Sequence, residues 1–148
     1  MHSIKLILAL SFFGILSSSA WSADPKHSES AHTQVILTQL KPDHYLITVK
    51  PSKAGETAGL QAFTTLRYIE ACSKAKFKFA KLTKFSTEPK INGKPNVTAS
   101  LIAAEFHCVT GTDAEMAEQI RLAKTLCARH GDSETKDVCK KLRDSKAI

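Results

Sequence analysis

The tetrapeptide Glu105-Phe106-His107-Cys108 is the densest group of reactive side chains in the sequence. Side chains alternate along a β-strand, so Glu105 and His107 point to one side of it, and His44 can lie on a neighbouring strand. A carboxylate beside an imidazole is a general acid–base pair, and two histidines can hold a metal. The segment therefore predicts either a secreted hydrolase that uses Glu105 and His107 or a polar cluster on a solvent-facing strand. The His-x-Glu spacing of metalloenzymes is missing, so we expect no metal and no cofactor.

A second candidate site is the basic stretch Lys74–Lys94, where seven lysines face a single acidic residue, Glu88. Strict alternation at its start predicts a strand that buries Phe77 and Phe79 and exposes lysines on the other face. The lysines assigned to a binding face are Lys76, Lys78, Lys81 and Lys84. Such a face attracts acidic polymers, which makes a polyanion or another envelope component the expected partner. A solvated strand face without a ligand is the other interpretation.

Four cysteines, Cys72, Cys108, Cys127 and Cys139, complete the set of reactive residues. An even number of cysteines in an exported chain predicts two disulfides, for which three pairings exist. Cys127 and Cys139 are close in sequence and flank a helix break, so we expect them to be joined, leaving Cys72 with Cys108. No Cys-x-x-Cys is present, so redox catalysis and zinc ribbons lack their usual signature. A disulfide also removes the Cys108 thiolate that nucleophilic catalysis needs.

The amino terminus predicts export. Residues 1–22 read as a signal peptide, with a basic start, an apolar run from Leu6 to Leu16 and small residues before the cleavage site. The apolar run is shorter than the roughly 20 residues that span a bilayer. We expect a periplasmic or secreted protein with no membrane span, whose residues 23–33 form a flexible amino terminus.

Residues 34–148 predict a single α+β domain. The chain has 148 residues, 43% hydrophobic and 24% charged, which excludes wholesale disorder and collagen-like structure. Its net charge is +7, and the basic excess lies before residue 101. The expected elements are strands at 34–39 and 44–50, a helix at 58–75, strands at 76–85 and 97–108, a helix from Thr112 to Gly131 and a short last helix through Leu142. This order, β-β-α-β-β-α-α, predicts an antiparallel four-stranded sheet with helices on one face.

Residues 44–85 carry a likeness to a known group of proteins. The strand HYLITVK precedes a helix with Arg67 and Ala71, and the aromatic strand KFKF follows. This arrangement resembles that of small uncharacterised bacterial envelope proteins. The resemblance implies an envelope location and no activity. Taken with the charge and the cysteines, the sequence predicts an exported, non-enzymatic binding protein whose ligand it does not name.

Overall fold

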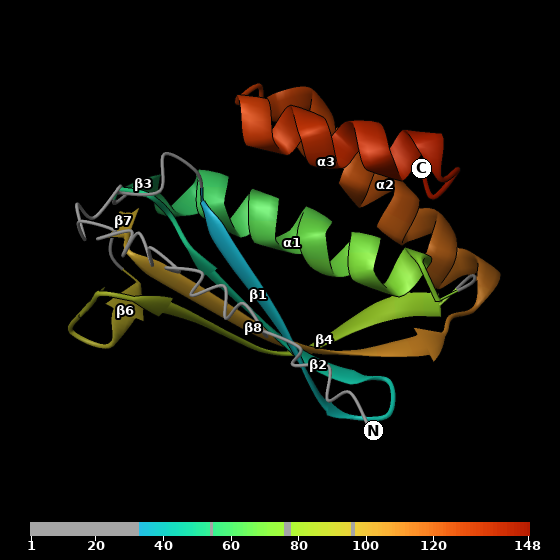
Figure 1. Cartoon of the computed structure of the whole chain (residues 1–148), viewed down its shortest axis with the longest axis horizontal. Helices are drawn as coiled ribbons and strands as arrows, with labels where there is room; N and C mark the ends of the chain where they lie inside the picture. Colours follow the sequence, from blue (N-terminus) through green and yellow to red (C-terminus); the bar gives the residue numbers. More distant parts are fainter. Residues whose placement is uncertain (1–32, 54, 76–77, 96) are drawn as a thin grey trace, which may run out of the picture.

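The computed structural model describes residues 33–53, 55–75, 78–95 and 97–148, and the predicted signal peptide lies outside these ranges. Its centre is an antiparallel four-stranded sheet in the order β1-β2-β8-β4. The strands are β1 (Gln34–Lys41), β2 (His44–Lys50), β4 (Lys78–Glu88) and β8 (Leu101–Thr110). The helices are α1 (Thr57–Ser73), α2 (Asp113–Arg129) and α3 (Ser133–Asp144), and all lie on one side of the sheet (Figure 1). The predicted α+β fold class is confirmed.

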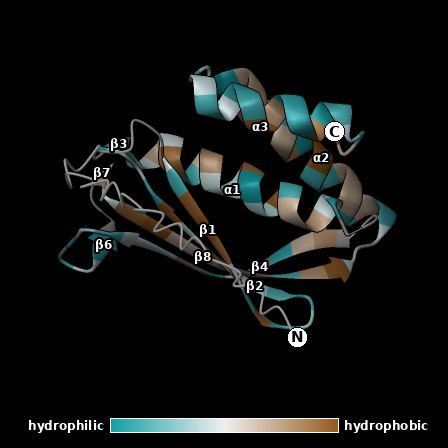
Figure 2. Cartoon of the chain, in the orientation of Figure 1, coloured by the Kyte–Doolittle hydropathy of each residue, from teal (hydrophilic) through white to brown (hydrophobic). Residues whose placement is uncertain are grey.

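The sheet buries one face against α1 and leaves the other, which we call the outer face, uncovered. Alternation along β8 puts Ile102, Ala104 and Phe106 in the core, where each is fully buried. On α1 the stripe Ala62, Leu66, Ile69 and Cys72, with Phe63 beside it, is buried as the helical spacing predicts. Figure 2 shows α1 lying over the sheet with both hydrophobic (brown) and hydrophilic (teal) residues along it.

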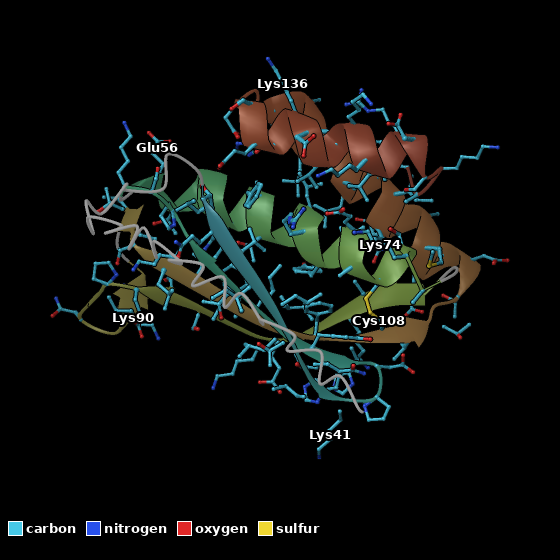
Figure 3. All side chains as sticks on the ribbon, viewed as in Figure 1. Lys41, Glu56, Lys74, Lys90, Cys108 and Lys136 are labelled. Carbon is cyan, nitrogen blue, oxygen red and sulfur yellow. A yellow bond between two sulfur atoms is a disulfide. The ribbon has the colours of Figure 1, made fainter. Side chains whose placement is uncertain are left out.

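Helices α2 and α3 form a hairpin beyond α1, held by a disulfide. A complete capping box opens α2, in which the Thr112 hydroxyl accepts from the Glu115 amide and the Glu115 carboxylate accepts from the Thr112 amide. Both predicted disulfides are confirmed. Cys127–Cys139 joins the two helices with a Cα–Cα distance of 5.9 Å, and Cys72–Cys108 joins α1 to β8 at 5.2 Å. The latter is the yellow bond near Cys108 in Figure 3. The helical spacing of α2 predicts a buried stripe of Met116, Ile120, Ala123 and Cys127, of which only Ala123 is fully buried, because one side of this peripheral helix stays in solvent.

Two expectations for the connecting segments need correction. The segment 51–56, expected to be irregular, contains strand β3 (Gly55–Glu56), which pairs with β7 (Thr98–Ala99). The single strand expected at 97–108 is therefore two strands, β7 and β8, and β8 continues to Thr110. Between β5 (Lys90–Ile91) and β6 (Lys94–Pro95), Asn92 and Gly93 form the tight turn, with φ values of 50° and 75°. Two positive φ angles in a row are what a two-residue hairpin turn requires.

The predicted orientation of β4 is wrong by one residue. Ala80 faces Cys108 in the core and is buried, whereas Phe79 pairs with Val109 on the other face and is half-buried. Lys76 and Phe77 lie outside the described residues, and only the backbone of Lys78 is described. The register shifts between Leu82 and Lys84, which marks a β-bulge. The error at Phe79 comes before this bulge, and it arises because alternation gives the period of a strand but not which of its two faces meets the core.

Candidate functional site

The first candidate site lies on the outer face, where β2 and β8 run side by side. His44 is directly opposite His107, and the two rings stack with centroids 3.9 Å apart and planes 16° apart. His44 Nε2 lies 2.6 Å from Oε1 of Glu105, and it donates in this bond because an ionised carboxylate only accepts. The structure therefore brings together the three residues that the sequence assigns to one cluster.

The lysines of β4 extend this cluster across the outer face. Lys81 pairs with His107, and Lys84 pairs with Glu105, so both side chains share the face of the histidine stack. Both lysines are exposed. The two candidate sites that the sequence presents separately are thus one polar row over β2, β8 and β4. Figure 3 shows Lys41 and Lys90 on this side of the sheet and Lys136 on the helix side.

The stacked arrangement of His44 and His107 determines whether they can share a metal ion. A nitrogen ligand binds a metal in the plane of its ring, and two nearly parallel stacked rings do not aim their nitrogens at a common ion. Among the described residues, no three or more His, Cys, Asp and Glu side chains are grouped so as to hold a metal. The His44–Glu105 pair has acid–base geometry on an open strand face, away from the groove described next. The hydrolase interpretation stays a prediction.

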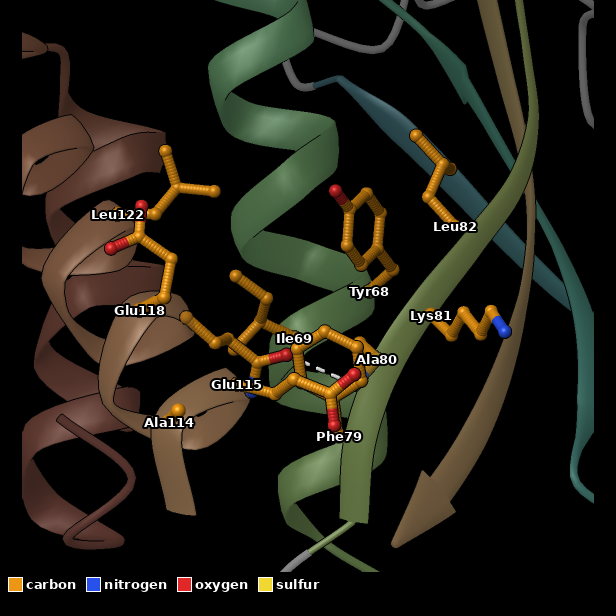
Figure 4. Close-up of a pocket in the computed structure, with 11 residues that line it drawn as sticks. Tyr68, Ile69, Phe79, Ala80, Lys81, Leu82, Ala114, Glu115, Glu118 and Leu122 are labelled. Atoms are coloured by element: carbon orange, nitrogen blue, oxygen red, sulfur yellow. Dashed lines mark hydrogen bonds between the residues drawn. The ribbon is translucent and has the colours of Figure 1, made fainter. Parts of the chain in front are cut away.

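The second candidate site is a groove between α2 and the edge strand β4, which we call the α2 groove (Figure 4). Its volume is about 550 Å³, within the roughly 300–1,000 Å³ typical of small-molecule pockets. Most of its lining is apolar. The lining residues are Tyr68, Ile69, Phe79, Ala80, Lys81, Leu82, Ala114, Glu115, Glu118, Gln119 and Leu122.

One hydrogen bond fixes the floor of the α2 groove. The backbone N–H of Ala80 donates to Oε1 of Gln119 at 2.9 Å, and the Gln119 side chain is buried. Ala80 belongs to an edge strand, so this amide would otherwise lack a partner on the side away from β8. Gln119 thereby sets the spacing between α2 and β4. In Figure 4, Leu122 of α2 and Leu82 of β4 stand on either side of Tyr68.

The polar groups at the α2 groove are already engaged. Hydrogen bonds from Thr112 lower the pKa of Glu115, and the bond to Arg121 lowers the pKa of Glu118, so both carboxylates are ionised at neutral pH. Glu118 is bound by two nitrogens of Arg121, at 2.6 and 2.7 Å. Burial raises the pKa of the Tyr68 phenol, which keeps it neutral. The groove thus offers an apolar surface with a fixed polar rim.

Sequence reasoning located the outer-face cluster but missed the α2 groove. The groove depends on how far α2 lies from β4, which no local pattern encodes. One signal was present: Gln119 is a polar residue beside the apolar stripe of α2, and a buried amide side chain needs a partner.

No family model matches the chain, and no curated protein and no solved structure matches it. The resemblance of residues 44–85 to envelope proteins therefore stays a prediction.

Proposed function

We propose that this chain is an exported, non-enzymatic binding protein that takes a small apolar ligand in the α2 groove. The observation that carries the proposal is the exposure of leucines on both sides of the groove. Leu82 is 42% exposed and Leu122 is 39% exposed, although both have apolar neighbours within the same hollow. A ligand that covered them would gain roughly 25 cal/mol for each Å² of apolar surface removed from water.

This energetic argument favours the groove over the outer face. Exposed lysines are fully hydrated and need no ligand to be stable, so a basic face is compatible with no binding function at all. Exposed leucines in a concave site gain no comparable stabilisation from hydration, so a ligand that covers them is favoured. An apolar hollow with a few fixed polar groups is a usual location of a ligand site, and the α2 groove has both features.

Two features support a binding role rather than catalysis at the groove. The carboxylates of Glu115 and Glu118 are held by Thr112 and Arg121, and both have lowered pKa values, which is the wrong direction for a general acid at neutral pH. Tyr68, with its raised pKa, is equally unsuited to act as a base.

The two disulfides fit an oxidising compartment, and none of the described helices is long and apolar enough to span a membrane. Export itself rests on the amino-terminal sequence pattern. The ligand is therefore proposed to be one that the protein meets outside the cytoplasm.

Binding of the neutral dye N-phenyl-1-naphthylamine tests the proposal, because a neutral probe ignores the lysine face. We expect saturable fluorescence enhancement, weakened at least tenfold by Leu122→Arg, which fills the groove with a charged side chain. Ala117→Arg is the matched control, since Ala117 is exposed on the same helix and does not line the groove. Unsaturable enhancement, or equal binding by Leu122→Arg and the native protein, would refute the groove as the site.

A second candidate function is favoured by the merging of the two polar clusters. Lys81 and Lys84 lie beside His107 on the outer face. Pairing with His44 adds Lys41 and alternation along β2 adds Lys50, against Glu88 and Glu105. This excess of cations supports binding of an acidic polymer, which would weaken steeply with salt.

Heparin chromatography tests this second function. The double variant Lys81→Gln, Lys84→Gln should keep its fold, because both side chains are exposed, and should elute at lower salt than the native protein. The variant Lys124→Gln, Lys136→Gln, with the same charge change on the helix side, should elute as the native protein does. Equal elution of both variants would mean that the lysine face is merely solvated.

A further inference from the structure

The two disulfides differ in how far a molecule from solution can reach them. Cys72 and Cys108 lie in the core, with 0% and 2% of their surface exposed. Cys139 is 1% exposed, but its partner Cys127 is half-buried and lines a pocket of about 430 Å³ at the α2–α3 hairpin. We call this hollow the disulfide pocket, and its other lining residues are Lys124, Ala128, Arg143 and Ile148. Thiol–disulfide exchange begins with attack on a sulfur that the thiol can reach, so Cys127 offers an entry that the buried bond lacks.

Both cysteines of the disulfide pocket have a cation one helical turn away. Lys124 precedes Cys127 by three residues on α2, and Arg143 follows Cys139 by four residues on α3. Residues at these spacings share one face of a helix, and both cations line the pocket. Both are exposed, and within the described ranges neither belongs to an ion pair. A neighbouring cation stabilises a thiolate, which is both the attacking and the leaving species in disulfide exchange.

We propose that Cys127–Cys139 is an exchange site for anionic thiols. The thiolate of an incoming molecule attacks Sγ of Cys127, where a new S–S bond forms, and the electron pair of the broken bond leaves on Sγ of Cys139. A second thiolate attacks the external sulfur of this mixed disulfide and frees Cys127 as a thiolate. The protein bond has then gained two electrons, and the two external thiols have been oxidised to one disulfide. Solvent protonates the cysteine thiolates.

The charge of the disulfide pocket selects the thiol. Lys124 and Arg143 bring two positive charges to the entry, and none of the described residues that line it has an acidic side chain. A carboxylate at Ile148 would still leave the cations in excess. A positively charged entry raises the local concentration of an anionic molecule and does nothing for a neutral one. We therefore expect a thiol that carries a carboxylate or sulfonate to react faster here than its neutral counterpart.

Exchange at this site loosens α3. The bond closes a loop between residues 12 positions apart, and without it α3 is held by the burial of Val138 and Leu142. The other disulfide ties α1 to β8 and stays closed. Helix α3 therefore gains mobility while α1 stays fixed to the sheet.

Reduction of the native protein by 2-mercaptoethanesulfonate, an anionic monothiol, tests the exchange site. Mass spectrometry of acid-quenched samples, with peptide mapping, shows which bond has opened. We expect Cys127–Cys139 to open at least about tenfold faster than Cys72–Cys108, with the thiol attached to Cys127 in the mixed disulfide. Equal rates for the two bonds, attachment to Cys139, or a Cys127–Cys139 bond that resists the thiol in the folded protein would each overturn the proposal.

The neutral thiol 2-mercaptoethanol isolates the effect of charge. In the variant Lys124→Gln, Arg143→Gln, whose altered side chains are exposed, the ratio of the anionic to the neutral rate should fall about fivefold. The matched control is Arg129→Gln, Lys141→Gln, which removes two charges from the same helices outside the pocket and should keep the native ratio. A ratio that is unchanged in the first variant, or lowered equally in both, overturns selection of the thiol by this pocket.

Discussion

At the scale of single residues, Gly111 shows how closely the α2 groove is built. A Cβ at this position would lie 2.7 Å from Cβ of Phe79 and 3.3 Å from Sδ of Met116. The flexible Met116 side chain can move aside, but the Phe79 contact cannot be relieved in this way, because the Phe79 Cβ is fixed to the strand. The absence of a side chain at Gly111 is therefore what lets β8 turn into α2 beside Phe79.

Gly111→Ala should consequently destabilise the protein by about 1–3 kcal/mol, the usual range for overpacking. Urea unfolding measures this as a fall in the midpoint at unchanged slope. The matched control is Gly131→Ala, because the nearest atom to its added Cβ is Cε of Lys136 at 3.9 Å. Equal urea midpoints for the two variants would contradict the close approach of Phe79 to Gly111.

Asp132 gives a prediction about pH. It caps α3, where its Oδ1 accepts from the Thr135 amide at 2.8 Å. Partial burial raises the pKa of this carboxyl, but the hydrogen bonds from Thr135 outweigh burial and leave the pKa below its ordinary value of 3.8. A group whose pKa is lowered by folding stabilises the folded state above its unfolded pKa, and this contribution disappears as pH falls through the folded pKa.

Asp132→Asn keeps a capping oxygen and removes the charge, so at pH 6 it should cost about 0.5 kcal/mol of helix-dipole stabilisation. The difference in melting temperature between the two proteins should shrink as pH falls below 3.8. Calorimetry at a series of pH values measures it. A difference in melting temperature that grew as the pH fell would show that the charge of Asp132 opposes folding.

Residue types alone were enough to locate the outer-face cluster. Period-two alternation placed Glu105 and His107 on one side of their strand, whereas the position of His44 opposite them depends on the pairing of β2 with β8, which the sequence allows but does not fix. The contact of Gln119 with Ala80 was not predictable in this way, because the two residues are 39 positions apart. Their meeting depends on the position of a helix relative to a sheet edge.

At the scale of elements, strand β4 shows where pattern reasoning failed. Alternation of Phe and Lys predicted Phe79 inside, yet Ala80 takes the core position opposite Cys108. The disulfide Cys72–Cys108 brings α1 close to β8 here, and a small residue beside it fits the limited space. Helices were predicted more accurately, because their apolar stripes and caps are local. The α1 stripe follows from helical spacing, and the sequence Thr112-Asp113-Ala114-Glu115 predicts the capping box that opens α2.

The disulfide Cys127–Cys139 gives the prediction at this scale. It closes a loop of 12 residues, for which the chain-entropy model predicts about 3 kcal/mol of stabilisation. Helix α3 otherwise depends on the burial of Val138 and Leu142. In Cys127→Ser, Cys139→Ser we expect faster amide exchange over residues 133–144 while β2 and β8 stay protected. Equal loss of protection in the sheet would show that α3 is not a separable unit.

At the scale of the whole molecule, the sequence predicted four antiparallel strands and helices on one face, but not the order of the strands. Placing β8 between β2 and β4 is what brings Lys81 and Lys84 beside His107 and Glu105. Strand order arises from long-range pairing, which a single sequence does not display. The two short sheets were missed for the same reason, since two-residue strands have no periodicity.

Export is a prediction about the whole chain. The order of basic, apolar and small residues before position 24 leads us to expect a mature protein that begins at Trp21 or Ala23. Intact mass of protein recovered from an exported fraction measures this directly. Retention of Met1 in that fraction would contradict it.

The most direct test of the proposed binding role is a titration of ¹⁵N-labelled native protein with N-phenyl-1-naphthylamine, followed by amide chemical shifts. If the α2 groove is the ligand site, saturable shifts should cluster at Ile69, Leu82, Ala114 and Leu122, which line it from three elements. The outer-face residues His44, Glu105 and His107 should be unaffected. Saturable shifts centred on the outer face, or no saturable shift at all, would contradict the account.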